Sequence, residues 1–266
     1  MLKDITIGQY LPGSSLIHKL DPRTKIVGAL IFMVALFAVK NLLGYLSMGM
    51  FTVLVIFLSR VPLSYLIKGL RPVLIIIIFT ITLHFFLTPG TEVFRWGILK
   101  ITWEGIRQGV FMGLRLVFLV LVTSLLTLTT SPISLTDGLE YLLSPGKRIG
   151  IPAHELAMMM SIALRFIPTL LEETEKIMKA QMARGADFSS GNLWTRAKSM
   201  VPLLVPLFVS AFRRADELAM AMEARCYRGG TGRTRMKQLM FGLRDYVTLA
   251  AVVLFAIYAV STRWWG

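Results

Sequence analysis

Two arginines have the residue type and the neighbours needed for recognition of a negative charge. Each follows an alanine and precedes a small residue, at the end of a stretch with helical periodicity: Ala183, Arg184 and Gly185, and Ala224, Arg225 and Cys226. Small neighbours leave a guanidinium exposed on a slim tip, where its planar fork can bind a carboxylate through two hydrogen bonds. A cation at a helix C-terminus also interacts favourably with the helix dipole. The triplets therefore indicate either docking tips for an acidic partner or dipole caps that also contact lipid headgroups.

The rest of the chain offers no pattern for catalysis or for metal binding. Cys226 is the only cysteine, so an intramolecular disulfide is impossible, and the three histidines are too far apart in sequence to form a ligand-spaced pair. The glycine-rich stretch 229–234 lacks the lysine of a phosphate-binding loop. We therefore expect no catalytic residue, no metal and no cofactor bound by this chain, and any energy from ATP must come through a partner.

Two long helices are expected to carry the arginine triplets. The first is predicted over residues 153–184, with a kink at Pro168 and a stop at Gly185. The second is predicted from Leu193 to Arg225, bent in its first half by two prolines. We expect both to be too charged to span lipid and to pack on each other beneath a membrane. Their apolar faces comprise Met159, Ala163, Phe166, Pro168 and Leu170 in the first helix and Leu204, Phe208 and Ala211 in the second.

Composition places these helices in a membrane protein. The chain has 266 residues, 55% of them hydrophobic and only 17% charged, with a mean hydropathy of +0.66. Such values are typical of a polytopic membrane protein. The net charge of +14 fits cytoplasmic loops that face anionic lipid, whereas the sequence lacks the basic patch with interleaved aromatics that would favour nucleic acid.

Five membrane spans are expected, at residues 26–39, 42–58, 73–87, 105–129 and 246–258. The first two runs are shorter than the roughly 20 residues that a helix needs to cross a bilayer. They indicate two short or tilted spans, which we prefer, or one re-entrant unit. Residues 61–71 are predicted to be a short amphipathic link, and residues 88–103 an outer loop. Gly105, Gly109 and Gly113 form a small-residue stripe that predicts the close approach of another helix.

The orientation follows from the start of the first span. Asp21 and Pro22 indicate a helix start with an N-cap and a proline at the first helical position. Lys19, Arg23 and Lys25 place this end in the cytoplasm by the positive-inside rule. An odd number of spans then puts the carboxyl terminus outside.

These elements predict an all-α polytopic membrane protein of about five transmembrane helices. We expect an N-terminal membrane domain over residues 1–130, with about four spans, and a cytoplasmic domain over residues 131–243. The latter has one short amphipathic helix at 135–143 and two long ones. Residues 244–266 form the last transmembrane helix.

An ordered set of short motifs gives the chain a family resemblance over essentially its whole length. The motifs are Tyr10-Leu11-Pro12-Gly13-Ser14-Ser15, Leu20-Asp21-Pro22-Arg23-Thr24-Lys25, Leu135-Thr136-Asp137-Gly138-Leu139-Glu140, Ala163-Leu164-Arg165-Phe166-Ile167-Pro168, and the two alanine-arginine triplets. Taken in this order, they resemble the transmembrane T component of energy-coupling factor transporters, the EcfT or CbiQ-type family. The second triplet departs from Ala-Arg-Gly by carrying Cys226, which is still a small residue.

The resemblance implies a non-catalytic coupling subunit of an ATP-driven uptake transporter for vitamins or transition-metal ions. The two long helices would be coupling helices that cross in an X, and the tips at Arg184 and Arg225 would each dock on one of two cytoplasmic ATP-binding-cassette ATPases. ATP and Mg would be bound by those partners. The apolar upper faces of the coupling helices would carry a substrate-binding membrane S component. The whole complex would lie in the plasma membrane of a prokaryote.

Two other functions stay open from the residues alone. A stand-alone secondary transporter usually has repeated halves and ionisable residues at mid-membrane depth, and this chain shows no repeat. A membrane scaffold or assembly protein could use the same helix pair to hold other proteins. The sequence does not identify the substrate, the number of S components served or whether the two ATPases are identical.

Overall fold

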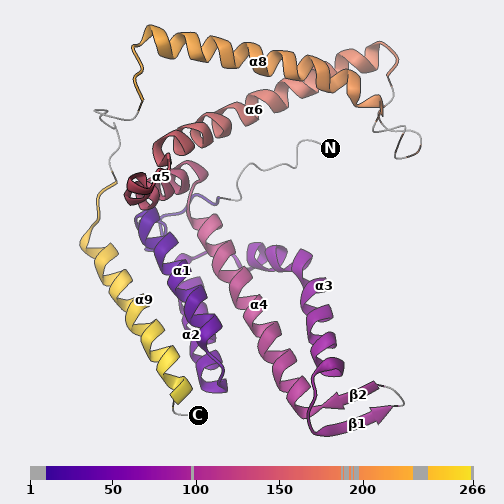
Figure 1. Ribbon diagram of the computed structural model, residues 1–266, viewed down its shortest axis with the longest axis vertical. Helices are drawn as coiled ribbons and strands as arrows, with labels where there is room; N and C mark the ends of the chain where they lie inside the picture. The colour runs from indigo at the N-terminus through magenta and orange to yellow at the C-terminus, as the bar shows by residue number, and fades with distance from the viewer. Residues whose placement is uncertain are drawn as a thin grey trace. The chain divides into compact units, whose positions relative to one another are not determined.

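The described part of the chain is almost entirely helical. The computed structural model describes residues 10–96, 99–186, 188, 192, 194, 198–229 and 239–264. Within these ranges lie eight α-helices, two short 3₁₀ helices and one strand pair (Figure 1). The described residues form two compact units, one of 10–142 with 239–264 and one of 143–229. We call them the bundle unit and the helix-pair unit; the functional division into three domains stays a prediction.

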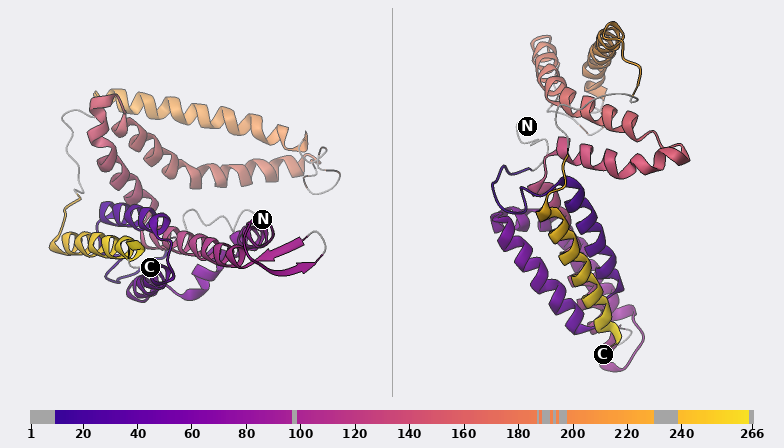
Figure 2. Two further views of the ribbon diagram at one scale, coloured as in Figure 1. Left: turned by 60° about the horizontal axis from the view of Figure 1, so that its bottom comes forward. Right: turned by 90° about the vertical axis from the view of Figure 1, so that its left-hand side faces the viewer.

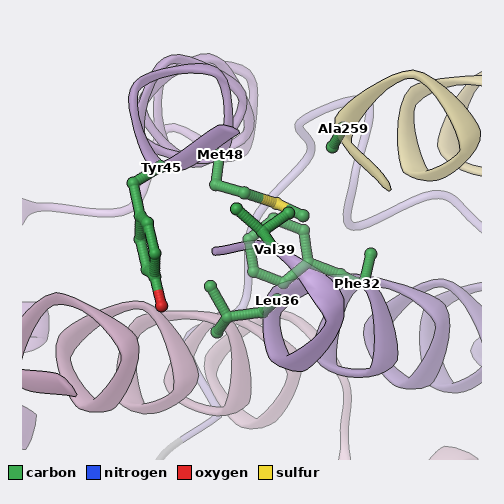
Figure 3. Packing of buried hydrophobic residues seen from close by; sticks show 7 residues of the cluster. Phe32, Leu36, Val39, Tyr45, Met48 and Ala259 are labelled. Atoms are coloured by element: carbon green, nitrogen blue, oxygen red, sulfur yellow. The ribbon is translucent and has the colours of Figure 1, made fainter. Parts of the chain in front are cut away.

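The bundle unit holds α1 (Pro22–Ala38), α2 (Leu42–Ser59), α3 (Leu63–Leu87), α4 (Trp103–Thr129), α5 (Pro132–Leu143) and α9 (Leu243–Ser261). Its main core joins α1, α2 and α9 through Phe32, Leu36, Met48 and Ala259, each at most 3% exposed (Figure 3). Stacked aromatic rings extend this core. Burial of these apolar side chains fixes the relative positions of helices that come from both ends of the sequence.

The first two apolar runs form two separate helices, as preferred over a single re-entrant unit. Val39 and Asn41, between α1 and α2, have extended backbone, which ends the first helix and starts the second. The predicted start of α1 is confirmed, because the Asp21 carboxylate accepts a hydrogen bond from the backbone N–H of Arg23 at 2.9 Å. At 17 residues, α1 is about 25 Å long.

Five helices in the described ranges are long and apolar enough to cross a membrane. They are α2, α3, α4, α9 and α6 (Ala153–Ala183). The set differs from the predicted one in two places. α1 is slightly too short to be counted among helices that could cross a membrane. α6, which we expected to be too charged, is long and apolar enough to be counted. The reason is the distribution of charge, because the first half of α6 carries only Glu155 and Arg165, whereas its other five charged residues all follow Leu171.

The prediction of a link at residues 61–71 followed by a separate third span is wrong. α3 runs without interruption from Leu63 to Leu87, with Pro72 inside it. Proline has no backbone N–H and its ring crowds the preceding turn, which bends a helix without ending it. Figure 1 shows this bend between a short first segment of α3 and its long second segment.

The outer loop predicted at 88–103 contains secondary structure. Residues Glu92–Trp96 (β1) and Leu99–Thr102 (β2) pair as an antiparallel hairpin. Thr102 then caps the next helix, since its hydroxyl accepts from the N–H of Gly105 at 3.1 Å. The fourth span therefore starts at Trp103, two residues before the predicted start.

The glycine stripe of α4 packs against α3, as the sequence predicts. Gly105, Gly109 and Gly113 are all buried. A Cβ atom at Gly105 would lie 2.6 Å from the carbonyl oxygen of His84, and one at Gly113 would lie 2.7 Å from Cδ1 of Ile81. Both distances are shorter than real Cβ contacts, so the two helices can approach this closely only because the side chains are absent.

Large apolar side chains cover the outside of the bundle unit. Ile75 and Phe79 of α3 are 77% and 62% exposed, and Phe57 of α2 is 80% exposed. Surfaces of this kind are stable in lipid and unstable in water. Together with the candidate spans, they make this chain a multi-pass membrane protein.

Arg23 and Lys25, two of the three cations from which a cytoplasmic amino terminus is predicted, are internal to the fold. Arg23 is only 5% exposed, and the Lys25 ammonium donates to the backbone oxygens of His18 and Thr129 at 3.2 and 2.8 Å. Lys19 remains exposed. A cationic side chain that donates its hydrogen bonds inside the fold is weak evidence for which side of the membrane this end faces. The orientation therefore stays a prediction.

Candidate coupling-helix site

The helix-pair unit consists of α6 and α8 (Val201–Ala224), with a 3₁₀ turn at Ser144–Ile149 before them. The predicted start of the second helix, Leu193, lies outside the described residues, and the described helix begins at Val201. Pro168 lies inside α6 at the predicted kink position, and the views in Figure 2 show α6 bending along its length beside the straighter α8.

The two helices run in opposite directions past each other. Near the end of α6, the side-chain amide of Gln181 donates to the backbone oxygen of Pro202, close to the start of α8, at 3.4 Å. At the other end of the pair, Met158 of α6 and Met222 of α8 line one hollow. An antiparallel pair necessarily places the C-terminal tips of its helices at opposite ends (Figure 1).

The first tip ends in a left-handed cap. Arg184 is the C-cap residue of α6, and Gly185 after it has φ +87°. The N–H of Gly185 donates to the oxygen of Met182 at 3.0 Å, and the N–H of Ala186 donates to that of Gln181 at 3.0 Å. These are the two bonds of a Schellman motif, which satisfies the last helical carbonyls and needs a residue that tolerates positive φ.

The second tip has the same geometry with a different residue in the left-handed position. Arg225 is the C-cap of α8, and Cys226 has φ +56°. The N–H of Cys226 donates to the oxygen of Glu223 at 2.8 Å, and the N–H of Tyr227 donates to that of Met222 at 3.1 Å. The substitution of cysteine for glycine therefore keeps the cap. It places a side chain where L-residues are strained.

Both arginines present their charge to the outside. Arg184 and Arg225 are exposed, as are the alanines that precede them, Ala183 and Ala224. Within the part of the chain that the structure describes, neither guanidinium has a carboxylate within ion-pair distance. Two cations on matching caps, neither paired with a described carboxylate, favour recognition of an external acidic group over an internal role.

A polar clasp joins the middle of the two helices, and the sequence analysis missed it. The Glu173 carboxylate of α6 accepts a short hydrogen bond from the Ser210 hydroxyl of α8. It also pairs with Arg214, whose Nη2 lies 3.1 Å from Oε2. A signal is present in the sequence, because Glu173 follows Leu170 by three residues and precedes Ile177 by four, which is the spacing of one helix face. A charge at such a position usually faces a partner on the neighbouring helix.

The predicted apolar faces are only partly used for packing between the two helices. Three of their members are half-buried: Phe166, Leu170 and Ala211. The other five are exposed: Met159, Ala163, Pro168, Leu204 and Phe208. Phe208 and Met159 are 59% and 55% exposed. The helix pair therefore keeps an apolar surface that is not covered by the described residues of this unit.

The second tip borders a hollow of about 530 Å³. Met158 and Ile162 of α6 line one side of it, and Leu218, Met222 and the segment from Arg225 to Gly229 line the other. Arg225 thus stands at the rim of a concave surface with an apolar wall. A hollow of this kind suits the insertion of a partner's side chains beside the arginine.

No described group of three or more His, Cys, Asp or Glu side chains is arranged to hold a metal ion. The site consists of a pair of amphipathic helices with one exposed arginine at the C-terminal cap of each helix.

This architecture defines a class: multi-pass helical membrane proteins with an additional pair of long amphipathic helices. Residues 13–238 match the family model CbiQ, described as cobalt transport protein. The chain is 60% identical over 269 residues to the energy-coupling factor transporter transmembrane protein EcfT of Clostridium kluyveri, with all of both chains covered. It is 52% identical over 257 residues to the protein of that name from Bacillus subtilis, covering 96% of this chain and 97% of that one. The chain therefore belongs to the CbiQ family of membrane transport proteins.

Proposed function

We propose that this chain is the coupling subunit of an energy-coupling factor transporter and transmits motion from two ATPases to a substrate-binding membrane protein. The observation that supports this function best is the equivalence of the two tips. Arg184 and Arg225 have the same cap geometry, the same exposure and small neighbours, at opposite ends of an antiparallel helix pair. Two matching tips suit two similar partners.

The partners proposed for the tips are two cytoplasmic ATP-binding-cassette ATPases. Each arginine would enter a groove and form a bidentate pair with a carboxylate there, an interaction that lysine cannot reproduce. ATP and Mg would be bound by these partners, and this chain would contribute no catalytic residue and no cofactor site. Closing of the ATPase pair would then move the tips relative to each other.

The exposed apolar face of the helix pair is the proposed seat of the S component. Met159, Leu204 and Phe208 are large, apolar and exposed, and such surfaces in a native protein mark contacts with another protein or with lipid. The S component would select the solute, which we expect to be a vitamin or a transition-metal ion. The family description names cobalt, whereas the names of the relatives specify no solute.

The proposed setting is the plasma membrane of a prokaryote. The amino terminus and the helix pair would face the cytoplasm, where ATP is available, and the carboxyl terminus would lie outside. The alternatives are a membrane scaffold, which would hold its partners without nucleotide-driven motion, and a stand-alone secondary transporter, which would need no ATPase.

A pull-down from native membranes tests the function. Tagged wild-type chain is compared with the double variant Arg184→Ala, Arg225→Ala. A control, Lys179→Ala with Arg213→Ala, removes one exposed cation from each helix outside the tip triplets. We expect two nucleotide-binding subunits with the wild type and the control, and their loss from the tip variant. Absence of any ATPase from the wild type would contradict the proposal and favour the scaffold or the secondary transporter.

A further inference from the structure

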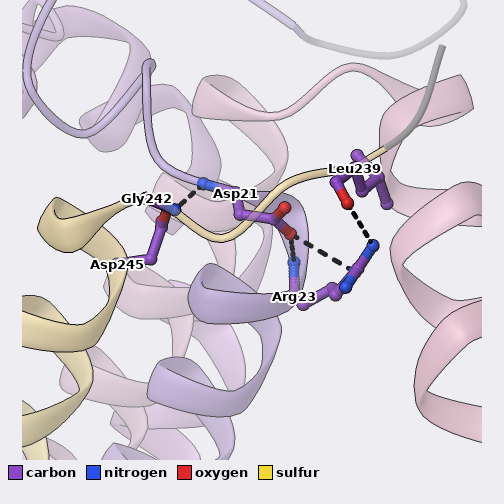
Figure 4. A network of polar contacts seen from close by, with 5 residues as sticks. All are labelled: Asp21, Arg23, Leu239, Gly242 and Asp245. Carbon is purple, nitrogen blue, oxygen red and sulfur yellow. Dashed lines mark hydrogen bonds and ion pairs between the residues drawn. The ribbon is translucent and has the colours of Figure 1, made fainter.

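Arg23 is a buried cation in the first turn of α1 that contacts two segments far from α1 in sequence. Its Nη2 donates to the backbone oxygen of Leu239 at 3.1 Å. Its guanidinium carbon lies 3.5 Å from the ring centroid of Tyr141 and 5.0 Å from that of Phe241. The two rings and the carbonyl enclose the guanidinium, which explains why Arg23 is only 5% exposed. Figure 4 shows the side chain reaching toward Leu239.

Tyr141 and Leu239 lie on either side of the helix-pair unit in the sequence. Tyr141 belongs to the end of α5, directly before the helix-pair unit begins at residue 143. Leu239 is the first described residue after that unit, directly before α9. One side chain of α1 therefore contacts two residues of the bundle unit, Tyr141 and Leu239, that flank the helix-pair unit in the sequence.

Arg23 itself is firmly anchored to the bundle unit. Its backbone N–H donates to the Asp21 carboxylate at 2.9 Å, and the backbone N–H of Asp21 donates to the Asp245 carboxylate at 2.8 Å. Asp245, only 5% exposed, also accepts from the N–H of Gly242 at 2.9 Å and so caps α9. This chain of hydrogen bonds, drawn in Figure 4, fixes the first turns of α1 and α9 to each other.

We propose that Arg23 is a positioning residue that holds Tyr141 and Leu239, the residues that flank the helix-pair unit in the sequence, against α1. A planar guanidinium can donate in its plane to Leu239 while its face stacks on Tyr141, whereas an ammonium offers one point of charge. With both connections locked, displacement of the tips is transmitted to the transmembrane helices instead of being absorbed by loose connecting segments. This role in transmission rests on the proposed function.

Distance measurements between two spin labels test the lock directly. The only cysteine, Cys226, is exposed at the second tip, and Val34→Cys adds a label site on α1 at a residue that is 70% exposed. The full chain is placed in lipid nanodiscs, and the distance distribution between the two labels is measured for three variants. Arg23→Lys keeps the charge, Tyr141→Leu removes the stacking partner, and Tyr141→Phe is the matched control that keeps the ring.

We expect the distribution to be broader in Arg23→Lys and Tyr141→Leu than in the parent, and to have the parent's width in Tyr141→Phe. A second label pair within the bundle, Val34→Cys with Leu254→Cys in a Cys226→Ser background, should stay narrow throughout. Unchanged distributions in both variants would overturn the proposal. Equal broadening of both label pairs would also overturn it, because Arg23 would then hold the bundle and not its connections. If Arg23→Lys does not fold, Tyr141→Leu decides alone. No ATPase is involved, so failed ATPase docking leaves this result intact.

Discussion

Cys226 occupies at the end of α8 the left-handed backbone position that Gly185 occupies at the end of α6. The φ angles are +56° and +87°, and the capping hydrogen bonds are the same. Only the first tip has the residue that this conformation favours. The second tip has the same geometry although cysteine disfavours a positive φ. A glycine at position 226 could therefore strengthen this cap without changing its shape.

We expect Cys226→Gly to stabilise the protein by about 1 kcal/mol or less, because removing Cβ relieves the left-handed strain while glycine adds backbone freedom to the unfolded chain. Gly185→Ala should destabilise it by about 1 kcal/mol for the opposite reason. Thermal unfolding of the full chain in detergent measures both. Equal melting temperatures for all three proteins would show that neither cap limits stability.

Arg→Lys at either tip should weaken ATPase association almost as much as Arg→Ala. Each tip loss should cost on the order of 2–5 kcal/mol of binding if a buried bidentate pair is broken. Titration of the purified ATPases onto the chain in nanodiscs gives the affinities. Wild-type affinity in the lysine variants would show that the tips act as simple point charges, which would remove the reason for arginine at both positions.

The clasp between α6 and α8 should be measurable as a pairwise coupling. Glu173 and Arg214 are 24% and 36% exposed in their side chains, so solvent screens the pair. A double-mutant cycle with Glu173→Gln and Arg214→Met should give a coupling energy of about 0.5–1 kcal/mol. Glu172→Gln is the control on the exposed side of the same turn. A coupling near zero would mean that the Ser210 hydrogen bond alone holds the clasp.

Substitution of a stripe glycine should separate α3 from α4. A Cβ at Gly105 meets the backbone oxygen of His84 at 2.6 Å, whereas one at Gly28 of α1 finds its nearest neighbour, Cγ2 of Val252, at 3.9 Å. We therefore expect Gly105→Ala to destabilise the protein by about 1–3 kcal/mol and Gly28→Ala to be tolerated. Unfolding of the two variants in detergent compares them, and equal stability would contradict the close-packing interpretation.

Acidification should destabilise the turn that precedes α1. Burial lowers the pKa of His18, and the positive charge of Lys25 acts in the same direction, whereas the hydrogen bond to the Leu11 carbonyl raises it. The neutral ring also bonds the Ser15 hydroxyl through Nδ1 at 2.6 Å. A histidine with a lowered folded pKa contributes stability above its ordinary pKa of about 6.5, and this stability is lost as the pH falls through that value toward the lowered one. The melting temperature should therefore fall below about pH 6.5 in the wild type, and less so in His18→Gln.

Much of the local structure follows from short-range chemistry that a sequence displays directly. Asp21 and Pro22 predict the start of α1 because an N-cap oxygen and a pre-set φ act within one turn. The stripe from Gly105 to Gly113 predicts a close helix contact because its periodicity is that of one helix face. In the same way, Gly185 predicts the end of α6. The five helices that are long and apolar enough to span a membrane confirm the predicted membrane class, and the family match confirms the predicted family.

The errors arise where a neighbour far away in sequence changes the environment of a residue. Pro72 looks like a boundary, yet the packing of α3 against α4 lets the helix continue through it. The segment after α3 forms a hairpin, although its residues suggested only a loop. The sequence also does not reveal the partners of Glu173, because Ser210 and Arg214 come from a helix whose register relative to α6 the sequence does not specify.

The sequence by itself determined the elements of this protein: apolar runs that need lipid, two amphipathic helices, and two arginines with small neighbours at their ends. These follow from local propensity and from the cost of exposing apolar surface to water. Only the tertiary structure decided that Arg23 is buried and contacts both Tyr141 and Leu239. A cation in a sequence is expected at the surface, because it can be buried only where the fold provides groups that replace its hydrogen bonds to water.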